Sequence, residues 1–370
     1  MAIITIEMDS FRNHFKTQIK FNPGLNILWG QNGSGKTSVL EAIHTLSFGK
    51  SFKTSKHQEL LTIGDELLTI KGNFSQKETK ETVTLHQNKK GERRFRVGDK
   101  RVFGLKDLIG KNPVVVLSPE EQAVTKGAPA QRRQFFNKMF SSISRPYAET
   151  LVRYHKILKQ RNAALIQIRD KKEKQDSLKI WDEHLSQEAI SLWKKRQDLF
   201  NQYNKELKKV LEGFSDDEKL NLEYQAPTLK KNTFLQKLNK TTTRDITTGQ
   251  TNAGPHRDDF NLIWDTKNLK KLGSQGEHKI TLILLKLAEL FFIATKTKTT
   301  PTLLLDDLFA KLDSDRSQKI VKLIKKFEQK FQTKIQTIIT TTDLISLEKS
   351  GIDTQAKNTK TLHLKRTCNA

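Results

Sequence analysis

Eight consecutive residues near the N-terminus have the types and spacing of a phosphate-binding loop. They fit the pattern GxxxxGK[ST] and are Gly30, Gln31, Asn32, Gly33, Ser34, Gly35, Lys36 and Thr37. An apolar run, Leu25 to Trp29, precedes the loop, and a run with helical spacing, Val39 to Leu46, follows it. A glycine loop between a strand and a helix directs backbone N–H groups at phosphates, while the lysine adds positive charge and the threonine hydroxyl suits Mg²⁺. The eight residues are therefore predicted to bind a nucleoside triphosphate.

A second motif places two carboxylates at the end of an apolar strand. Asp306 and Asp307 directly follow the run Leu303 to Leu305. If this strand lies beside the strand of the phosphate loop, Asp306 would hold the metal ion, and Asp307 would orient or deprotonate an attacking water. An apolar strand that ends in aspartate is common by itself, but each motif predicts the other. We therefore expect Thr37 and Asp306 to form an Mg²⁺ site and Asp307 to be catalytic.

A serine between two glycines stands directly before a long amphipathic run. The segment is Gly273, Ser274, Gln275, Gly276, and the run extends to Thr295. A serine hydroxyl, a glycine backbone and a helix dipole can together hold a phosphate. The serine alone can also serve as an ordinary helix N-cap. We assign Ser274 and Gly276 to nucleotide binding and keep the N-cap as the alternative.

The elements that must position these residues alternate between strands and helices at both ends of the chain. Short β-rich runs are expected at residues 3–8, 18–21, 25–29, 67–74, 114–117, 302–305 and 335–340, with an antiparallel hairpin at 82–97. Residues 146–211 are highly charged and carry apolar side chains at helical spacing, which predicts two long helices. We expect an α/β ATPase lobe with an antiparallel β annex, plus a mainly helical second lobe or short arm. The predicted parts are 1–130 and 296–370 for the ATPase lobe and 131–295 for the helical lobe.

The charge balance indicates a polyanionic partner. The chain has 66 Lys and Arg against 41 Asp and Glu, a net charge of +25, which favours nucleic acid. Cys368 is the single cysteine, so no intrachain disulfide is expected and a reducing cytoplasm fits best. The run Ile280 to Ala294 contains Lys286 and Glu289 and is too short to span a bilayer, so no membrane partner is expected.

Four blocks of residues follow one another along the chain. The first block is the phosphate loop. The others are Leu117 to Glu120 with Gly127, Pro129, Arg132, Arg133 and Phe135; Gly254 to Asp259; and Ser274 to Gly276 with Leu304 to Asp313 and Arg316. Together these blocks resemble the RecF family of bacterial recombination mediators, which is related to the heads of structural-maintenance-of-chromosomes proteins and to ATP-binding-cassette ATPases. An accidental match to all four in order is improbable, because consistent motifs reinforce one another.

The resemblance implies more about the site. It implies that the nucleotide is ATP. It also implies a homodimer that holds ATP between its two subunits, in which Ser274 of one subunit contacts the nucleotide bound by the other. It places a γ-phosphate-sensing group after the strand that ends near Thr340, where we expect Thr342 to act. Arg12 or Asn13 is expected to approach the nucleotide, or else to lie in a surface turn.

Three positions depart from the pattern that the resemblance implies. Lys311 and Glu277 stand where the family usually has Glu and Gln, and Asn137 replaces a common acidic residue. A carboxylate at Glu277 is expected to weaken nucleotide-driven dimerisation. The family places Asp313 in a loop that communicates across the dimer. His256 is expected to make a structural contact and to take no part in catalysis.

The function that the resemblance implies is recombinational repair and replication-fork maintenance. The protein would bind gapped or duplex DNA and hydrolyse ATP slowly as a switch, with DNA stimulation, and RecR and RecO would be partners in loading RecA. Candidate DNA contacts are the lysines and arginines of the helical arm and Arg93, Arg94 and Arg96 on the hairpin, although such charges are often simply solvated.

Three alternatives are an ATPase subunit of a membrane transporter, a nuclease-linked ATPase of the overcoming-lysogenisation-defect type, and a DNA-tethering ATPase. The net charge of +25 fits the first poorly. The second would need an additional acidic metal-binding domain. Helices of about 30 residues reach only about 45 Å, which is too short for the third.

Overall fold

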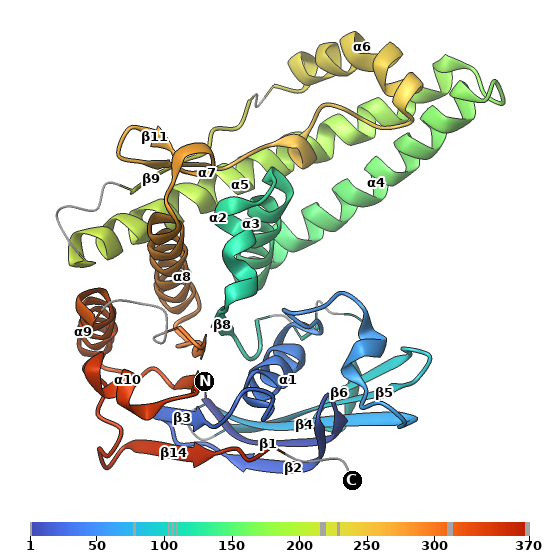
Figure 1. The fold of residues 1–370 in the computed structure, drawn as a ribbon. Helices are drawn as coiled ribbons and strands as arrows, with labels where there is room; N and C mark the ends of the chain where they lie inside the picture. Colours follow the sequence, from blue (N-terminus) through green and yellow to red (C-terminus); the bar gives the residue numbers. More distant parts are fainter. Residues whose placement is uncertain are drawn as a thin grey trace. The chain divides into compact units, whose positions relative to one another are not determined.

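The computed structural model describes residues 2–76, 79–102, 104, 107–108, 110–214, 220–227, 230–308 and 314–366. Lys311, Asp313 and Cys368 lie outside the described residues, so the expectations for them stay predictions. The chain forms two compact units (Figure 1). Unit 1 comprises Met1–Gln122, Lys209–Asp216 and Ile283–Ala370, and unit 2 comprises Ala123–Lys208 and Asp217–Leu282.

Unit 1 contains a parallel sheet with the strand order β14-β3-β13-β12-β8. Its strands are β3 (Leu25–Trp29), β8 (Val114–Leu117), β12 (Thr302–Asp306), β13 (Thr337–Thr341) and β14 (Thr359–His363). Every residue of β8, β12 and β13 is buried, as expected for parallel strands that are covered on both faces. Because all five strands run in one direction, their carboxyl ends meet at one edge of the sheet.

A second sheet of unit 1 is antiparallel, with the order β2-β1-β4-β5-β6-β7. Its strands are β1 (Ala2–Phe11), β2 (His14–Lys20), β4 (Leu67–Gln76), β5 (Thr79–Asn88), β6 (Arg93–Val97) and β7 (Lys100–Val102). Apolar side chains alternate along the strands, so that one face is buried and the other is polar. This sheet contains the predicted antiparallel annex, whose hairpin pairs β5 with β6.

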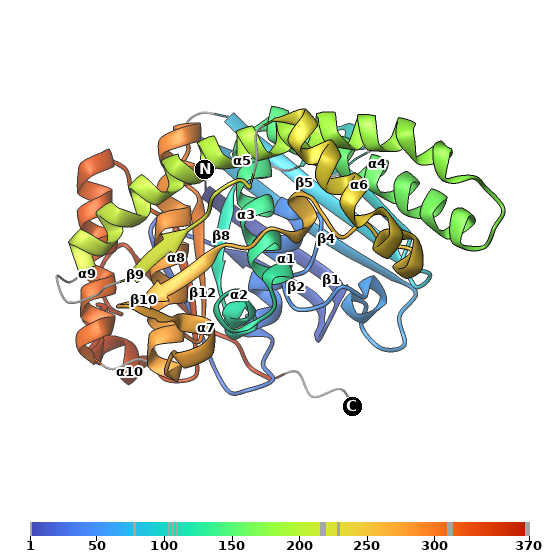
Figure 2. The ribbon, with the colours of Figure 1, turned by 90° about the horizontal axis from the view of Figure 1, so that it is seen from above.

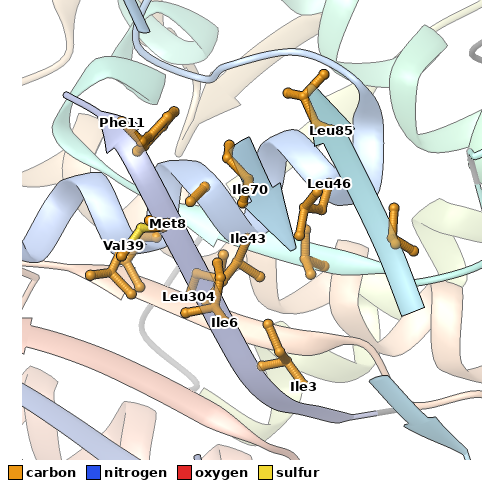
Figure 3. Close-up of a cluster of buried hydrophobic side chains, with 14 of the residues drawn as sticks. Ile3, Ile6, Met8, Phe11, Val39, Ile43, Leu46, Ile70, Leu85 and Leu304 are labelled. Atoms are coloured by element: carbon orange, nitrogen blue, oxygen red, sulfur yellow. The ribbon is translucent and has the colours of Figure 1, made fainter. Parts of the chain in front are cut away.

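Helix α1 (Lys36–Phe48) contacts both sheets and forms the centre of the unit 1 core. It begins after Gly35, and it ends at Gly49, whose left-handed backbone lets its N–H bond to Thr45. Figure 3 shows Val39, Ile43 and Leu46 of this helix among side chains of β1, β4, β5 and β12. The core therefore fixes the first turn of α1, and with it the end of the phosphate loop.

Besides the end of α5 (Leu178–Phe214), further helices and 3₁₀ turns belong to the described part of unit 1. They are η1 (His57–Leu60), η3 (Pro119–Gln122), α9 (Ser314–Phe331), α10 (Leu344–Lys349) and the C-terminal part of α8 (Gln275–Thr297). Helix α9 buries an apolar stripe of Ile320, Leu323 and Phe327, and the Phe327 ring stacks on Phe291 of α8 at 3.9 Å.

Unit 2 is mainly helical. Its helices and 3₁₀ turns are α2 (Ala123–Lys126), α3 (Pro129–Ile143), α4 (Arg145–Arg169), η4 (Gln175–Ser177), α5 (Leu178–Phe214), α6 (Lys231–Thr248), η5 (Pro255–Arg257), α7 (Leu269–Leu272) and the start of α8. A small antiparallel sheet joins β9 (Leu220–Glu223), β10 (Asn261–Trp264) and β11 (Lys267–Asn268). Helices α4 and α5 lie side by side, as Figure 2 shows, and ion pairs such as Arg153 with Glu188 link them.

Two buried arginines organise unit 2. Arg196 donates to Asp258 Oδ2 at 2.6 Å, and the same oxygen accepts from Trp193 Nε1 at 2.8 Å and Tyr224 Oη at 2.9 Å. Arg161 donates to Asp182 at 2.6 Å and to Asp245 at 2.8 Å. Buried charges of this kind are stable only when they are paired and hydrogen-bonded, and these are both.

The boundaries of the units differ from those expected. The expected division at 130/131 and 295/296 lies instead at 122/123 and 282/283, and the end of α5 at Lys209–Asp216 groups with unit 1. The later boundary falls inside α8, a single continuous helix, so no break in composition marks it. Within the described ranges, no helix combines the length and the apolar character needed to cross a membrane.

Candidate nucleotide-binding site

The phosphate loop leaves no space for side chains at two of its glycines. Gly30 has φ 148° and Gly35 has φ 90°, which L-residues with side chains rarely adopt. A β-carbon at Gly30 would lie 2.3 Å from the carbonyl oxygen of Leu364, and one at Gly35 would lie 2.5 Å from His14 Nε2. Both glycines are therefore required by the close approach of neighbouring segments.

The turn between β1 and β2 supports the loop from outside. Asn13 Nδ2 donates to the carbonyl oxygen of Gly33 at 3.0 Å, and His14 Nε2 contacts that of Gly35 at 3.1 Å. Burial lowers the pKa of His14, which favours the neutral ring. A carbonyl can only accept, so Nε2 must carry the proton in this contact. Arg12 is instead held by Glu41 at 2.9 and 2.6 Å, so Asn13 is the residue of this turn that reaches the loop.

Lys36 and Thr37 lie at the start of α1. Lys36 Nζ donates to the carbonyl oxygens of Gly30 and Gln31, both at 2.8 Å. Thr37 Oγ1 donates to Asp306 Oδ1 at 2.8 Å, and Thr340 Oγ1 donates to the same oxygen at 2.7 Å. The parallel register that pairs Asp306 with Thr340 brings these groups together. The two predicted motifs thus meet at the carboxyl edge of the sheet, although the strands are not neighbours as expected, since β13 lies between β3 and β12.

Burial shifts the pKa values of Asp306 and Lys36 in opposite directions, in each case against the charged form. Burial raises the pKa of the Asp306 carboxyl, and Glu120, which follows β8, adds a smaller effect in the same direction. The hydroxyls of Thr340 and Thr37 stabilise the carboxylate and partly offset this rise in pKa. Burial lowers the pKa of Lys36, while Asp307 and Asp306 raise it. A site of this kind accommodates a ligand that brings both phosphate charge and a cation.

Asp307 combines a strained backbone with an oxygen that lacks a partner. Its φ is 49°, in the left-handed region, and its N–H donates to Thr340 Oγ1 at 3.0 Å. Its Oδ1 is buried without a hydrogen-bond partner in the described structure, and the same is true of Ser34 Oγ in the phosphate loop. Buried polar atoms are nearly always paired, so unpaired ones in a loop of this type indicate a ligand position.

The residues present fit MgATP. The loop has the positive-φ glycines of an anion-binding nest, and Lys36 is held by loop carbonyls that a phosphate can replace as its partner. Thr37 and Asp306 supply the oxygen ligands that Mg²⁺ prefers, with few protein ligands and the remainder left to phosphate and water.

Thr342 is exposed and follows the end of β13, and its catalytic role stays a prediction. Sequence reasoning missed Thr340, which donates to Asp306 together with Thr37. Asn13, one of the two residues expected to approach the nucleotide, supports the Gly33 carbonyl, a contact that the sequence does not reveal. Strand alternation could have pointed to Thr340, because residues two apart in a strand face the same side. Thr340 and Thr342 have this spacing, and of the two only Thr340 lies within β13.

Ser274 and Gly276 lie in unit 2 at the start of α8. Ser274 Oγ accepts from the N–H of Glu277 at 3.2 Å, and Glu277 Oε2 accepts from the N–H of Ser274 at 2.6 Å. This reciprocal pair is a capping box, so the N-cap reading of Ser274 holds for the single chain. Glu277 has a local role at its own helix terminus, which the sequence analysis did not anticipate. Nucleotide contact by Ser274 and Gly276 stays a prediction.

Two other motif residues have structural partners in unit 2. His256 Nδ1 lies 2.6 Å from Tyr154 Oη, and its Nε2 lies 2.9 Å from the carbonyl oxygen of Thr251. Burial lowers the pKa of His256 to about 4, so the ring is neutral at physiological pH. Asn137 Oδ1 accepts from Tyr147 Oη at 2.6 Å. The structural role expected for His256 agrees with these contacts.

Comparison with known proteins gives a consistent result. The family model described as "RecF/RecN/SMC N terminal domain" matches residues 2–361. The DNA replication and repair protein RecF of Lachnoclostridium phytofermentans is 32% identical over 355 residues, which is 96% of each chain. RecF of Agathobacter rectalis is also 32% identical, over 87% of this chain and 89% of the relative.

Solved structures agree in fold. The recombination mediator protein RecF-ATP of the RecFOR pathway superposes with a TM-score of 0.83 at 30% identity, covering 92% of both chains. An Smc head domain from Pyrococcus furiosus superposes with a TM-score of 0.55 at 17% identity, covering 94% of this chain and 91% of that one, which shows a shared fold. The expected fold class is confirmed. The chain therefore belongs to the RecF family of DNA replication and repair proteins, within the wider RecF/RecN/SMC group.

Proposed function

We propose that this RecF-family chain binds MgATP at the phosphate loop, hydrolyses it slowly, and uses the nucleotide to control its binding to DNA in recombinational repair. One observation carries the proposal: Thr37, Thr340 and Asp306 form one hydrogen-bonded group beside the unpaired carboxylate oxygen of Asp307. The relative solved as RecF-ATP supports ATP as the nucleotide.

The residues of the site have separate roles in this proposal. The loop amides from Gly33 to Thr37 bind phosphate oxygens, and Lys36 exchanges its loop carbonyls for phosphate. Thr37 and Asp306 hold Mg²⁺, which neutralises phosphate charge when it is bound. Asp307 Oδ1 accepts the proton of the attacking water, because it is buried next to the site and has no hydrogen-bond partner among the described residues.

The proposed dimer would complete the site. Ser274 and Gly276 of one chain would contact the nucleotide of the other through the N-terminus of α8. In the single chain the Glu277 carboxylate accepts the Ser274 N–H, so it offsets the positive end of its own helix. We therefore infer that dimerisation is weaker than it would be with a neutral side chain at this position.

The outer face of the hairpin is the proposed DNA-binding surface of unit 1. Arg94 and Arg96 are exposed, and the strand register places Arg96 opposite Arg101 and Arg94 opposite His86. Exposed arginines on one strand face are well suited to bind the phosphates of a nucleic acid, so we propose a polyanion as the ligand of this face. We also propose duplex or gapped DNA as the partner, with RecR and RecO acting before RecA.

Arg93 does not belong to this surface. It is partly buried, donates to the carbonyl oxygen of Gly49 at 2.7 Å, and has its guanidinium 5.0 Å from the Phe95 ring centre. Burial lowers its pKa to about 10. We therefore leave Arg93 out of the proposed DNA surface, because strand alternation turns its side chain away from Arg94.

Equilibrium binding tests the proposal. Gapped, duplex and single-stranded DNA are titrated with ATP, ADP or no nucleotide, at several salt concentrations, using the native chain, Lys36→Met and Arg94→Ala/Arg96→Ala. We expect binding that requires ATP and Lys36, and a salt slope that falls by roughly 2 in the double variant. Binding that ignores both nucleotide and Lys36 would contradict an ATP-controlled DNA-binding protein. A salt slope unchanged in the double variant would exclude the hairpin as the DNA surface.

A further inference from the structure

The last strand of the chain delivers a basic segment to the phosphate loop. Strand β14 is parallel to β3 and pairs His363 with Trp29, whose rings stack at 4.1 Å. In the sheet order β14 lies on the opposite side of β3 from β13. Parallel strands end at one edge, so the residues after His363 emerge beside the loop that follows Trp29.

Contacts after β14 hold this segment against the loop. The N–H of Leu364 donates to the carbonyl oxygen of Trp29 at 2.8 Å. The carbonyl oxygen of Leu364 occupies the space that a side chain at Gly30 would need, 2.3 Å from the position of such a β-carbon. The backbone of the segment is therefore fixed next to the first glycine of the loop.

Arg366 extends this contact to the middle of the loop. A β-carbon on Gly33 would lie 3.9 Å from Arg366 Nε, and among the described residues no other heavy atom outside the chain neighbours of Gly33 lies within 4 Å of that point. Gly33 has φ 83° and is one of the residues that turn the loop around a phosphate. The guanidinium of Arg366 thus lies next to Gly33, on the side to which a β-carbon there would project.

The carboxylates at this edge of the sheet lie on one side of the phosphate loop, and Arg366 adds a positive charge on the other side. The ends of β8 and β12 bring Glu120, Asp306 and Asp307 to the edge, whereas β14 brings Arg366 to the other side of the loop. Arg366 is exposed, and within the described part of the chain it forms no hydrogen bond or ion pair. A guanidinium that is not engaged by a carboxylate can form paired hydrogen bonds with phosphate oxygens.

We propose that Arg366 is a nucleotide-binding residue whose guanidinium reaches past Gly33 to contact the polyphosphate of the bound nucleotide. The inference rests on the proposed nucleotide site and adds to it a residue from outside the phosphate-loop and aspartate motifs. Arg366 would favour nucleotides with a β-phosphate over a monophosphate, because the loop encloses the β-phosphate.

The test is calorimetric titration of the full chain with ATP and ADP in the presence of Mg²⁺, and with AMP by competition. The variants are Arg366→Ala and Arg366→Lys, with the neighbouring exposed lysine changed in the control Lys365→Ala. We expect Arg366→Ala to weaken ATP and ADP about fivefold to tenfold and AMP less than twofold. Arg366→Lys should recover part of the loss, and Lys365→Ala should stay within twofold of the native chain.

The other possible results distinguish an error in the role of Arg366 from an error in the proposed nucleotide site. If Arg366→Ala leaves ATP affinity unchanged while Lys36→Met abolishes it, the proposed site stands and the role of Arg366 is wrong. If Lys36→Met also binds ATP normally, the proposed site itself is wrong. An equal loss for AMP would place Arg366 on the base or ribose, and an equal loss in Lys365→Ala would show only a general charge effect; both contradict a specific polyphosphate contact.

Discussion

Unit 1 and unit 2 both contain charged motif residues, but those of unit 2 are paired with one another, whereas one carboxylate of unit 1 has an oxygen without a partner among the described residues. In unit 2, Arg196 and Asp258 bond directly, and Trp193 and Tyr224 donate to the same carboxylate oxygen. In unit 1, Asp307 keeps a buried oxygen without a partner in the described structure and holds a left-handed backbone. The difference separates charges that stabilise the fold from charges kept for a ligand.

The same contrast explains why two similar motifs have different roles. The segment from Gly254 to Asp259 contains a histidine, an arginine and two carboxylates, which by composition could form a catalytic site. Its Asp259 instead accepts two hydrogen bonds from Arg132, at 2.7 and 2.8 Å, and its Asp258 pairs with Arg196. With its charges paired within unit 2, the segment acts as a core element.

The largest expected effect comes from breaking the pairing in unit 2. Asp258→Ala leaves the fully buried Arg196 guanidinium without its main counter-charge, and we expect unit 2 to lose about 3–5 kcal/mol of unfolding free energy. Urea unfolding followed by tryptophan fluorescence measures this, since Trp193 lies in the cluster. The matched control is Asp176→Ala, which breaks an exposed pair with Lys179 and should cost less than about 1 kcal/mol. Equal losses in the two variants would contradict the distinction.

The next effect concerns the unpaired carboxylate of unit 1. Asp307→Asn removes the proposed proton acceptor but breaks no side-chain hydrogen bond among the described residues, so ATP hydrolysis should slow by about 10²–10³-fold while the unfolding free energy hardly changes. Single-turnover hydrolysis and thermal melting measure the two quantities. ATP affinity, titrated in parallel, serves as the internal control and should stay within a few-fold. A variant that hydrolyses ATP at the native rate would remove Asp307 from catalysis.

Much of the scaffold could be predicted from the sequence, because its signals are local. Strands β3, β6 and β8 have the expected ends, since each is a short apolar or alternating run bounded by polar or turn residues. Helix α6 was missed, because its Thr- and Lys-rich sequence buries few side chains, among them Phe234 and Leu238. Strand β14 was missed because its pairing with β3 is a tertiary contact.

The sequence predicts which residue types form the site, but it does not predict the strand register that selects the individual residues. The sequence places four threonine or aspartate residues, 340 to 343, after an apolar run, and any of them could face the site. The parallel pairing of β12 with β13 selects Thr340 by setting it opposite Asp306. Register between strands more than 30 residues apart depends on the packing of the whole sheet, which composition and spacing do not reveal.

The smallest effect has the opposite sign from the first and concerns Asp306. Its pKa is raised by burial, so the ionised carboxylate at neutral pH opposes folding of the nucleotide-free chain. Asp306→Asn removes this charge and keeps an oxygen able to accept from Thr37 and Thr340. We expect the variant to melt at a slightly higher temperature than the native chain at pH 7 without nucleotide, and to lose the stabilisation that MgATP gives the native chain.

The pH dependence of that difference follows from the direction of the shift in pKa. The folded chain holds the Asp306 proton more tightly than the unfolded chain, so native stability falls as pH rises from the ordinary aspartate pKa of about 4 to the raised folded value. The gap in melting temperature between variant and native chain should therefore be absent below about pH 4, open across this window and stay constant above it. Thermal melting between pH 4 and pH 8 measures the gap, with Asp307→Asn as the control for a neighbouring charge. A gap that closes as the pH rises would mean that the hydroxyls of Thr37 and Thr340 outweigh burial, and that Asp306 belongs with the paired charges of unit 2.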